Sequence, residues 1–256
     1  MKQLIKKLVP PGMLKTYQQR KALGDHYGKG VECPICGAEY KKFGPYGVVL
    51  TDNRLCFNCG SLERHRLLWK YLHERTDLFT GTTPIRVLHF AAEKIFNTAI
   101  TKLKRIEYVP CDLVPEMYAV EGATPVVKAD ITAIPFPDDH FDVILCNHVL
   151  EHIPDDRLAM RELYRVMKKG GWGIFQVPID YSRKETYEDF SITTPEARQQ
   201  AFGQKDHVRW YGQDYPERLR SVGFMVKEDD YVQRLSPADR KRFVLREDEV
   251  VYFCRK

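Results

Sequence analysis

Long apolar runs are missing from this 256-residue sequence. None approaches the roughly 18 residues that a membrane-spanning helix needs. The N-terminus carries lysines but lacks the apolar core of a secretory signal peptide, so we expect a cytoplasmic protein. Repeats and low-complexity segments are also absent. With 43% hydrophobic and 29% charged residues, the composition is that of a globular protein rather than a disordered one.

A general basic bias is also lacking. The net charge is +5, but residues 1–30 alone carry seven basic side chains against Asp25, which is +6. The remainder therefore totals −1 and gives no electrostatic indication of nucleic-acid binding. We interpret residues 1–30 as a basic arm that docks on the body. Its interleaved leucines also allow contact with an anionic membrane surface, which would place the protein at the inner face of the membrane, or with RNA.

Seven cysteines in a cytoplasmic chain indicate metal or free thiols rather than disulfides. Two pairs, Cys33-Pro-Ile-Cys36 and Cys56-Phe-Asn-Cys59, are separated by 19 residues, a spacing typical of a four-cysteine zinc site. Gly37 and Gly60 can supply the backbone freedom that two tight turns need. Four thiolates close the coordination sphere, so the predicted Zn²⁺ is structural. Cys111, Cys146 and Cys254 are interpreted as strand packing residues.

The predicted zinc-ribbon-like module spans residues 31–80 and includes a connecting helix. Between the cysteine pairs, residues 40–50 are predicted to form a hairpin that turns near residues 44–47. A helix over residues 61–79 follows, with Ser61 as its N-cap. Arg64, His65 and Arg66 are interpreted as part of a solvated helix face, with anion binding as the alternative.

The most informative stretch is residues 141–156. Phe141 to Cys146 is a nearly continuous apolar run, Asn147 and His148 follow it, and Asp155 is placed to cap a helix running to about Lys169. Such a run is typical of a strand buried on both faces in a parallel sheet. Ligands of such sheets bind beyond the carboxyl ends of the strands. The polar residues after Cys146 are therefore expected at a functional site of an α/β fold.

This stretch, FDVILCNHVLEHIPD, together with ELYRVMKKGGWGIFQVP, resembles the fourth strand, helix and fifth strand of class I S-adenosylmethionine-dependent methyltransferases. The resemblance covers Ile85 to Lys256. It implies a domain over residues 84–256 with a doubly wound, mostly parallel seven-stranded sheet of the Rossmann-like type. It also implies S-adenosylmethionine as cofactor, and a last strand, Val250–Cys254, that lies antiparallel at the sheet edge.

The resemblance assigns cofactor-binding roles to residues at the strand ends. The sequence departs from the family after the first strand, because Ala91, Ala92 and Glu93 replace a glycine-rich turn and His89 replaces an acidic residue. At the end of the second strand, an acidic side chain can accept hydrogen bonds from a ribose diol. Asp130 and Ile131 match the family's adenine-binding pair. The predicted cofactor-binding residues are His89, Ala91, Glu93, Asp112, Asp130, Ile131 and Asn147.

Residues 179–213 show no clean periodicity but are dense in aromatic and charged residues. Because long irregular segments are often functional, we predict that residues 179–211 form a lid that selects the methyl acceptor. Tyr181 and Trp210 could stack on a ring, and Arg183 and Arg209 could hold an anionic group. The alternative is a surface excursion that covers the sheet edge. His148, His152 and His207 are the candidate general bases, each weighed against a purely structural role, and His148 is the best placed.

Two classes of function remain open from the sequence. The first is a methyltransferase acting on a small molecule or glycan, with RNA methylation aided by the zinc module as a related possibility. The second is a zinc-module binding protein with an inactive methyltransferase-like domain. Asp112, Asp130 and Asn147 favour the first. The identity of the acceptor cannot be read from the sequence.

Overall fold

The computed structural model describes residues 24–256, which divide into two compact units. The first unit contains the described residues up to Lys70 together with Leu235–Glu247, and the second contains Tyr71–Arg234 and Asp248–Lys256. Leu235–Glu247 thus joins the cysteine-containing unit, although the sequence-based boundaries placed it within residues 84–256. Most of the predicted basic arm, residues 1–23, lies outside the described residues.

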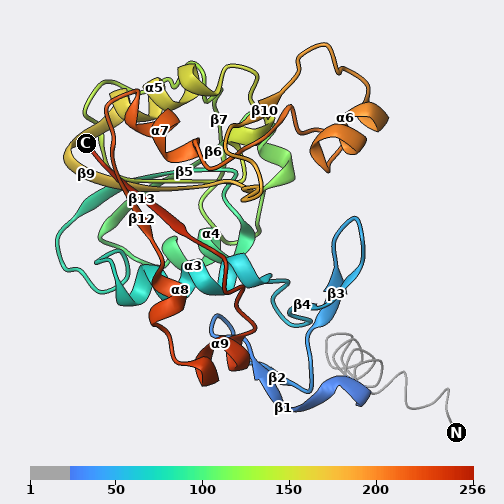
Figure 1. The fold of residues 1–256 in the computed structure, drawn as a ribbon. Helices are drawn as coiled ribbons and strands as arrows, with labels where there is room; N and C mark the ends of the chain where they lie inside the picture. The colour runs from blue at the N-terminus through green and yellow to red at the C-terminus, as the bar shows by residue number, and fades with distance from the viewer. Residues whose placement is uncertain (1–23) are drawn as a thin grey trace, which may run out of the picture. The chain divides into compact units, whose positions relative to one another are not determined.

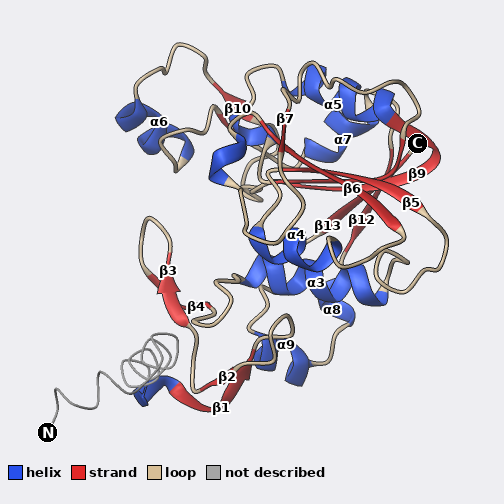
Figure 2. Ribbon diagram, turned by 180° about the vertical axis from the view of Figure 1, so that it is seen from behind, coloured by secondary structure: helices blue, strands red, loops and turns tan. Residues whose placement is uncertain are grey.

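The second unit is built on a seven-stranded sheet with the order β12-β13-β9-β8-β5-β6-β7, as the resemblance implied. Helices α5 and α7 cover one face of this sheet and α4 lies on the other (Figures 1 and 2). The strands are β5 (Ile85–Phe90), β6 (Ile106–Asp112), β7 (Val127–Lys128), β8 (Phe141–Asn147), β9 (Met167–Gln176), β12 (Met225–Asp229) and β13 (Val251–Arg255). The helices are α4 (Lys94–Ile100), α5 (Asp156–Val166), α6 (Pro195–Phe202), α7 (Tyr215–Arg220) and α8 (Tyr231–Arg234).

Burial explains why the central strands form. All residues of β8 except the half-buried Asp142 are buried, as expected for a strand covered on both faces. Helix α5 packs against this sheet through its apolar face, formed by Ala159, Met160, Leu163 and Val166. The Asp155 side chain accepts a hydrogen bond from the Leu158 amide at 2.8 Å and so caps α5, as the sequence predicted.

The last strand does not lie at the edge of the sheet. β13 pairs antiparallel with β9 on one side and with β12 on the other, so the edge strand is β12. The prediction of an antiparallel last strand is confirmed, but its edge position is wrong. β12 is the sixth strand along the chain, and its neighbour in space is the seventh.

Helix α5 is shorter than predicted. It ends at Val166, and Met167, Lys168 and Lys169 belong to β9 instead of a last helical turn. Met167 pairs with Phe141, while the Lys168 ammonium donates to both carboxylate oxygens of Asp142 at 2.9 Å. Pairing with β8 therefore overrides the helical preference of this segment.

The first unit contains two small antiparallel sheets. They pair β1 (Tyr27–Glu32) with β2 (Glu39–Tyr40) and β3 (Gly44–Tyr46) with β4 (Thr51–Leu55). The predicted hairpin is therefore displaced: residues 44–46 form a strand, and the chain turns at residues 47–50. The unit also contains η1 (Gly24–His26) and α9 (Pro237–Phe243), with Ser236 capping α9 as its sequence indicates. One core cluster of this unit, around the cysteines, consists of Val31, Cys33, Tyr40, Phe43 and Cys56.

Helix α3 spans Glu63–Glu74, so it begins later and ends earlier than predicted. Ser61 is not its N-cap, because its hydroxyl lies 3.2 Å from the Cys33 sulfur and the Leu62 amide donates to His65 Nδ1 instead. Arg66 is completely buried and donates to the backbone oxygens of Arg54, Ser61, Phe243 and Val244. The prediction of a solvated helix face at residues 64–66 is therefore wrong for His65 and Arg66, which are both buried.

Among the described residues, no helix has the length and apolar character required to cross a membrane.

Candidate active site and cysteine cluster

The strand order changes direction at β5, because β6 and β7 follow on one side of it and β8 and β9 on the other. β6 is parallel to β5 on one side and β8 is parallel to it on the other. Crevices that bind ligands in open α/β sheets form at such switch points, outside the carboxyl ends of the strands. The residues that follow β5, β6 and β8 therefore line the candidate active site.

The turn after β5 keeps a glycine-like backbone although glycine is absent. Ala91 has a φ of 50°, in the left-handed region, and its amide donates to the Cys111 oxygen at 2.9 Å. Helix α4 starts immediately after Glu93. Alanine tolerates this conformation at a modest energetic cost, so the tight turn is preserved.

His89 has a different role from the predicted contact with a cofactor. Its side chain is fully buried, with Nδ1 2.9 Å from the Tyr108 hydroxyl and Nε2 3.1 Å from Glu93 Oε2. Both ring nitrogens are thus engaged within the protein. His89 holds Glu93 at the amino end of α4, and Glu93 is the side chain of this pair that reaches solvent.

The two predicted aspartates lie at the ends of neighbouring strands. Asp112 closes β6, where its Oδ1 accepts from the Val114 amide at 2.7 Å, and burial raises the pKa of its carboxyl. Asp130 follows β7 and is exposed, with Oδ1 accepting from the amide and the hydroxyl of Thr132. Ile131 beside it is buried. Each carboxylate therefore uses one oxygen to shape its own turn.

Asn147 is the most unusual polar residue of the sheet. It ends β8, is only 3% exposed, and neither its amide oxygen nor its amide nitrogen has a hydrogen-bond partner among the described residues. Buried amides are normally paired, because an unmade hydrogen bond costs about 1–3 kcal/mol. An unpartnered amide at the carboxyl end of a central strand makes Asn147 a candidate contact for a polar ligand.

His148 and Glu151 form an acid–base pair that the sequence only partly revealed. His148 has a φ of 55°, and its Nδ1 lies 3.4 Å from Glu151 Oε1. Burial opposes ionisation of Glu151, but His148 and His152 outweigh it and lower the pKa of this carboxyl. The sequence placed Glu151 with Asn147 and His148 at the functional site but predicted no role for it, although its spacing of three from His148 was a usable signal. It lies in η3 (Leu150–His152).

Tyr118 is a second residue that sequence reasoning missed. Burial raises the pKa of its hydroxyl, and the negative charges of Asp112, Glu93, Asp206 and Glu151 raise it further. These acids come from different strand ends and from the 179–213 segment, and all of them act on one half-buried ring. All four acids are therefore near enough to Tyr118 to affect its ionisation. No sequence motif predicted a role for Tyr118, which follows the short η2 (Pro115–Met117).

Arg209 is an internal brace. Its side chain is fully buried; Nη1 donates to the Leu150 and Ile153 oxygens at 2.9 and 2.5 Å, and Nη2 donates to the Pro154 oxygen at 2.8 Å. Nε donates to Glu188 at 2.9 Å. All three nitrogens of the Arg209 guanidinium group donate to protein atoms. Arg209 therefore cannot serve as the substrate-binding residue that the sequence predicted.

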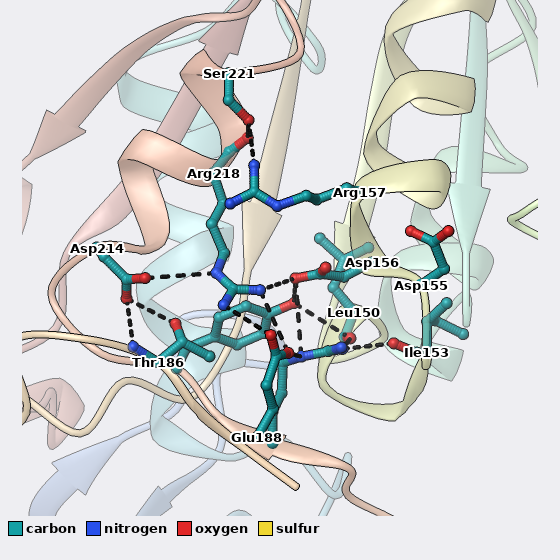
Figure 3. Close-up of polar contacts among 12 residues, drawn as sticks. Leu150, Ile153, Asp155, Asp156, Arg157, Thr186, Glu188, Asp214, Arg218 and Ser221 are labelled. Atoms are coloured by element: carbon teal, nitrogen blue, oxygen red, sulfur yellow. Dashed lines mark hydrogen bonds and ion pairs between the residues drawn. The ribbon is translucent and has the colours of Figure 1, made fainter. Parts of the chain in front are cut away.

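A buried polar network fixes both ends of the 179–213 segment. Figure 3 shows Arg218 between Asp156, Asp214 and Glu188. Its guanidinium lies 3.1 Å from both Asp156 and Glu188 and 3.5 Å from Asp214. Thr186 is held by Asp214 through its amide and hydroxyl. β10 (Tyr187–Glu188) pairs with β11 (Arg209–Trp210), and the chain between them, with α6, projects from the layered body (Figures 1 and 2).

The remaining predicted acceptor residues lie in different environments. Tyr181 and Arg183 are exposed at the start of the segment, and the Arg183 guanidinium lies over the Tyr187 ring. Trp210 is half-buried in β11. His207 is buried, its ring crosses that of His152 at 4.8 Å, and burial lowers its pKa. The structure thus brings His207 beside His152 and Glu151, while Tyr181 and Arg183 remain open to solvent.

The first unit gathers Cys33, Cys36, Cys56 and Cys59, whose sulfurs all lie within 4.8 Å of one another. The Cys33–Cys59 and Cys36–Cys56 sulfur distances are 3.6 and 3.7 Å. Four thiolates at about 2.3 Å around a tetrahedral zinc ion stand roughly 3.8 Å apart, so the cluster fits this metal. Both predicted glycines complete the turns with positive φ, and their amides donate to the Cys33 and Cys56 oxygens.

Comparison with known families matches residues 93–175 to the methyltransferase domain family. This range begins at the turn after β5 and ends within β9. It therefore contains Asp112, Asp130, Asn147, His148 and Glu151.

Curated relatives are similar over part of the chain. A demethylmenaquinone methyltransferase of Corynebacterium efficiens is 32% identical over 48% of this chain and 50% of its own length. A ubiquinone/menaquinone biosynthesis C-methyltransferase of Vibrio campbellii is 28% identical over 41% of this chain and 44% of its own length. The chain spans half or less of the length of these relatives.

Solved structures share the fold. The [4+2]-cyclase SpnF has a TM-score of 0.55, with 15% identity over 94% of each chain. An S-adenosylmethionine-dependent methyltransferase from Mesorhizobium loti has a TM-score of 0.50, with 14% identity over 73% of this chain and 97% of its own. Residues 93–175 thus match the methyltransferase domain family, and they lie in a sheet with the Rossmann-like fold of class I S-adenosylmethionine-dependent methyltransferases.

Proposed function

We propose that this protein transfers a methyl group from S-adenosylmethionine to a small aromatic acceptor of the phenol or hydroquinone type. The observation that carries the proposal is the buried, unpartnered amide of Asn147 at the switch point of a methyltransferase fold. The negative charges of Glu93, Asp112 and Glu151, which follow three different strands, all raise the pKa of the Tyr118 hydroxyl and so support a shared site. The sequence match over residues 93–175 supports the reaction class.

The residues present fit the cofactor. The second oxygen of Asp112 is available to accept from the ribose diol, Asp130 with Ile131 can receive the adenine, and the Asn147 amide can pair with the amino-acid end. Glu93, held by His89, can accept from the cofactor's ammonium group. When bound, S-adenosylmethionine supplies an activated methyl group with its own leaving group. The protein then has to align the acceptor and manage one proton.

His148 is the proposed general base. Its side chain is partly exposed, and Glu151 faces its Nδ1 at 3.4 Å, so the negative charge stabilises the imidazolium formed when a phenolic proton is taken up. The names of the two curated relatives refer to quinone rings, which favours a small aromatic acceptor over a glycan. RNA methylation stays the weaker alternative, because nothing in the site favours it.

We propose that residues 179–211 select the acceptor through Tyr181 and Arg183. We do not expect the whole segment to close as a lid, because buried contacts of Arg209 and Arg218 hold both of its ends in place. Adjustment is therefore expected in the excursion between β10 and β11, where α6 projects. Trp210 supports this excursion from β11, with its ring against Gly203.

We further propose that the cysteine cluster holds one structural Zn²⁺. The support is the four sulfur positions and the two glycine turns, together with a donor set that zinc prefers. Membrane contact by the basic arm stays a prediction from the sequence, because residues 1–23 lie outside the described part.

The cofactor assignment is tested by calorimetric titration with S-adenosylhomocysteine. Asp112→Ala is expected to weaken binding by about 1.5–3 kcal/mol, the worth of hydrogen bonds to a charged group. The matched control is Asp230→Ala, which removes an exposed aspartate after β12, paired with Arg234, and should leave the affinity unchanged. Equal affinity of Asp112→Ala and wild type would remove Asp112 from the site. Absence of binding by the wild type would refute the proposed function.

A further inference from the structure

Three potential metal ligands meet beside the proposed base. They are Glu151 and His152 at the end of η3 and His207 from the loop before β11. One ligand atom from each lies within 4.8 Å of the other two. Glu151 and His207 are only 1% and 2% exposed, and His152 is partly open to solvent. Two imidazoles and one carboxylate are a common donor set for divalent transition metals.

Buried atoms of this group have no partner among the described residues. They are Glu151 Oε2 and His207 Nδ1. A carboxylate oxygen buried without a donor and an imidazole nitrogen buried without a partner are each unfavourable. No group among the described residues hydrogen-bonds to either of these two atoms. A cation between the two atoms would satisfy both.

The outer contacts orient the ligands. His152 Nδ1 faces the Asp206 backbone oxygen at 3.2 Å and its carboxylate at 3.6 Å, which leaves Nε2 on the side of Glu151. Metal-binding histidines typically use one nitrogen in this way, which fixes the tautomer and frees the other nitrogen for the ion.

The backbone around the cluster is rigidly tied. The Val208 amide donates to the Glu151 oxygen at 3.0 Å, so the two segments that carry the ligands are directly bonded. Arg209 binds the backbone oxygens of Leu150 and Ile153 on either side of the η3 ligands. Preorganised ligands of this kind reduce the cost of metal binding.

We propose that Glu151, His152 and His207 bind one divalent transition-metal ion. Ligand atoms at about 2.0–2.2 Å from a metal stand at most roughly 4.4 Å apart, so small side-chain rotations close the present site. Three protein ligands leave coordination positions open for oxygen donors. If the proposed function holds, an open position binds the ring oxygen of the acceptor and lowers its pKa near His148.

The test is a titration of the full-length, zinc-loaded protein with Mn²⁺ as the only added ligand. Electron paramagnetic resonance then measures the concentration of free Mn²⁺. Mn²⁺ prefers oxygen and nitrogen donors to thiolates, so the cysteine cluster does not compete. The wild type is expected to bind one Mn²⁺ per chain. Glu151→Gln and His207→Gln are each expected to weaken binding by at least about tenfold, since even outer-shell changes cost 10–100-fold.

Two further variants keep the result interpretable. His152→Gln alters a partly exposed ligand without opening the core, and it should weaken Mn²⁺ binding by a similar factor. His140→Gln removes a histidine that stacks on Phe136, away from the cluster, and should bind like the wild type. Absence of Mn²⁺ binding by the wild type, or equal binding by His152→Gln and the wild type, would overturn the proposal. The titration contains neither cofactor nor acceptor, so failure of methyl transfer does not affect it.

Discussion

Ala91 shows how one residue can replace a glycine at a cofactor turn. Its φ of 50° costs an alanine about 1–2 kcal/mol relative to the right-handed region. Glycine would remove this cost but add about 0.4–1 kcal/mol of unfolded-state entropy. Ala91→Gly is therefore expected to raise the free energy of unfolding by about 0.5–1 kcal/mol in denaturant titrations.

The neighbouring Ala92 provides the control. It is completely buried and its φ is not positive, so Ala92→Gly should lower the free energy of unfolding. If both substitutions destabilise the protein equally, the left-handed turn at Ala91 carries no strain.

Arg66 and Arg209 mark a limit of sequence reasoning at the scale of single residues. Both were read from sequence as exposed or ligand-binding, yet both are buried with backbone carbonyls around them. Partners of Arg66 at Phe243 and Val244 lie 177 and 178 positions away, and those of Arg209 lie 55 to 59 positions away. No local pattern carries such information, because the carbonyls have no side-chain signature.

β10 and β11 owe their position to ionised side chains, which gives a pH prediction. Burial opposes ionisation of Glu188, but the bonds from Arg218 and Arg209 outweigh it and lower the pKa of this carboxyl. The unfolded chain therefore binds more protons below the ordinary glutamate pKa of about 4.3. The stability that Glu188 contributes is present above that value and is lost as the pH falls toward the lower native pKa.

The measurement is the free energy of unfolding between about pH 5 and pH 3. Wild type should lose more stability over this range than Glu188→Gln, whose side chain does not titrate. Glu185→Gln, an exposed neighbour, should follow the wild type. Parallel curves for wild type and Glu188→Gln would show that the network does not depend on this charge.

Elements were predictable where one interaction dominates. The apolar run of β8 and the Asp155 cap of α5 follow from local chemistry, and the structure has them at the expected residues. Boundaries failed where pairing with a distant strand decides, as at Lys168. Within the site, the positions of Asp112 and Asn147 could be predicted because both residues end strands. Glu151, His152 and His207 come together only in the folded chain, where the Val208 amide donates to the Glu151 backbone oxygen in η3.

At the scale of the whole molecule, the two units rely on different sources of stability. The described core cluster of the first unit contains five buried residues, two of which are cysteines of the cluster. The sheet unit has a far larger apolar core. Small metal-binding modules usually fold together with their metal. We therefore expect the loss of zinc to unfold the first unit but not the sheet.

Cys59→Ser in the full-length chain tests this expectation. The variant should contain one equivalent less zinc than the wild type, because three thiolates no longer close the site. Hydrogen exchange of backbone amides in residues 27–60 should accelerate strongly, while the amides of β5 and β8 keep their protection. Affinity for S-adenosylhomocysteine should change by less than about threefold, under 1 kcal/mol. Cys254→Ala removes a buried thiol from β13 and should retain all the zinc. Unchanged exchange in residues 27–60 of Cys59→Ser would mean that the first unit folds without its metal.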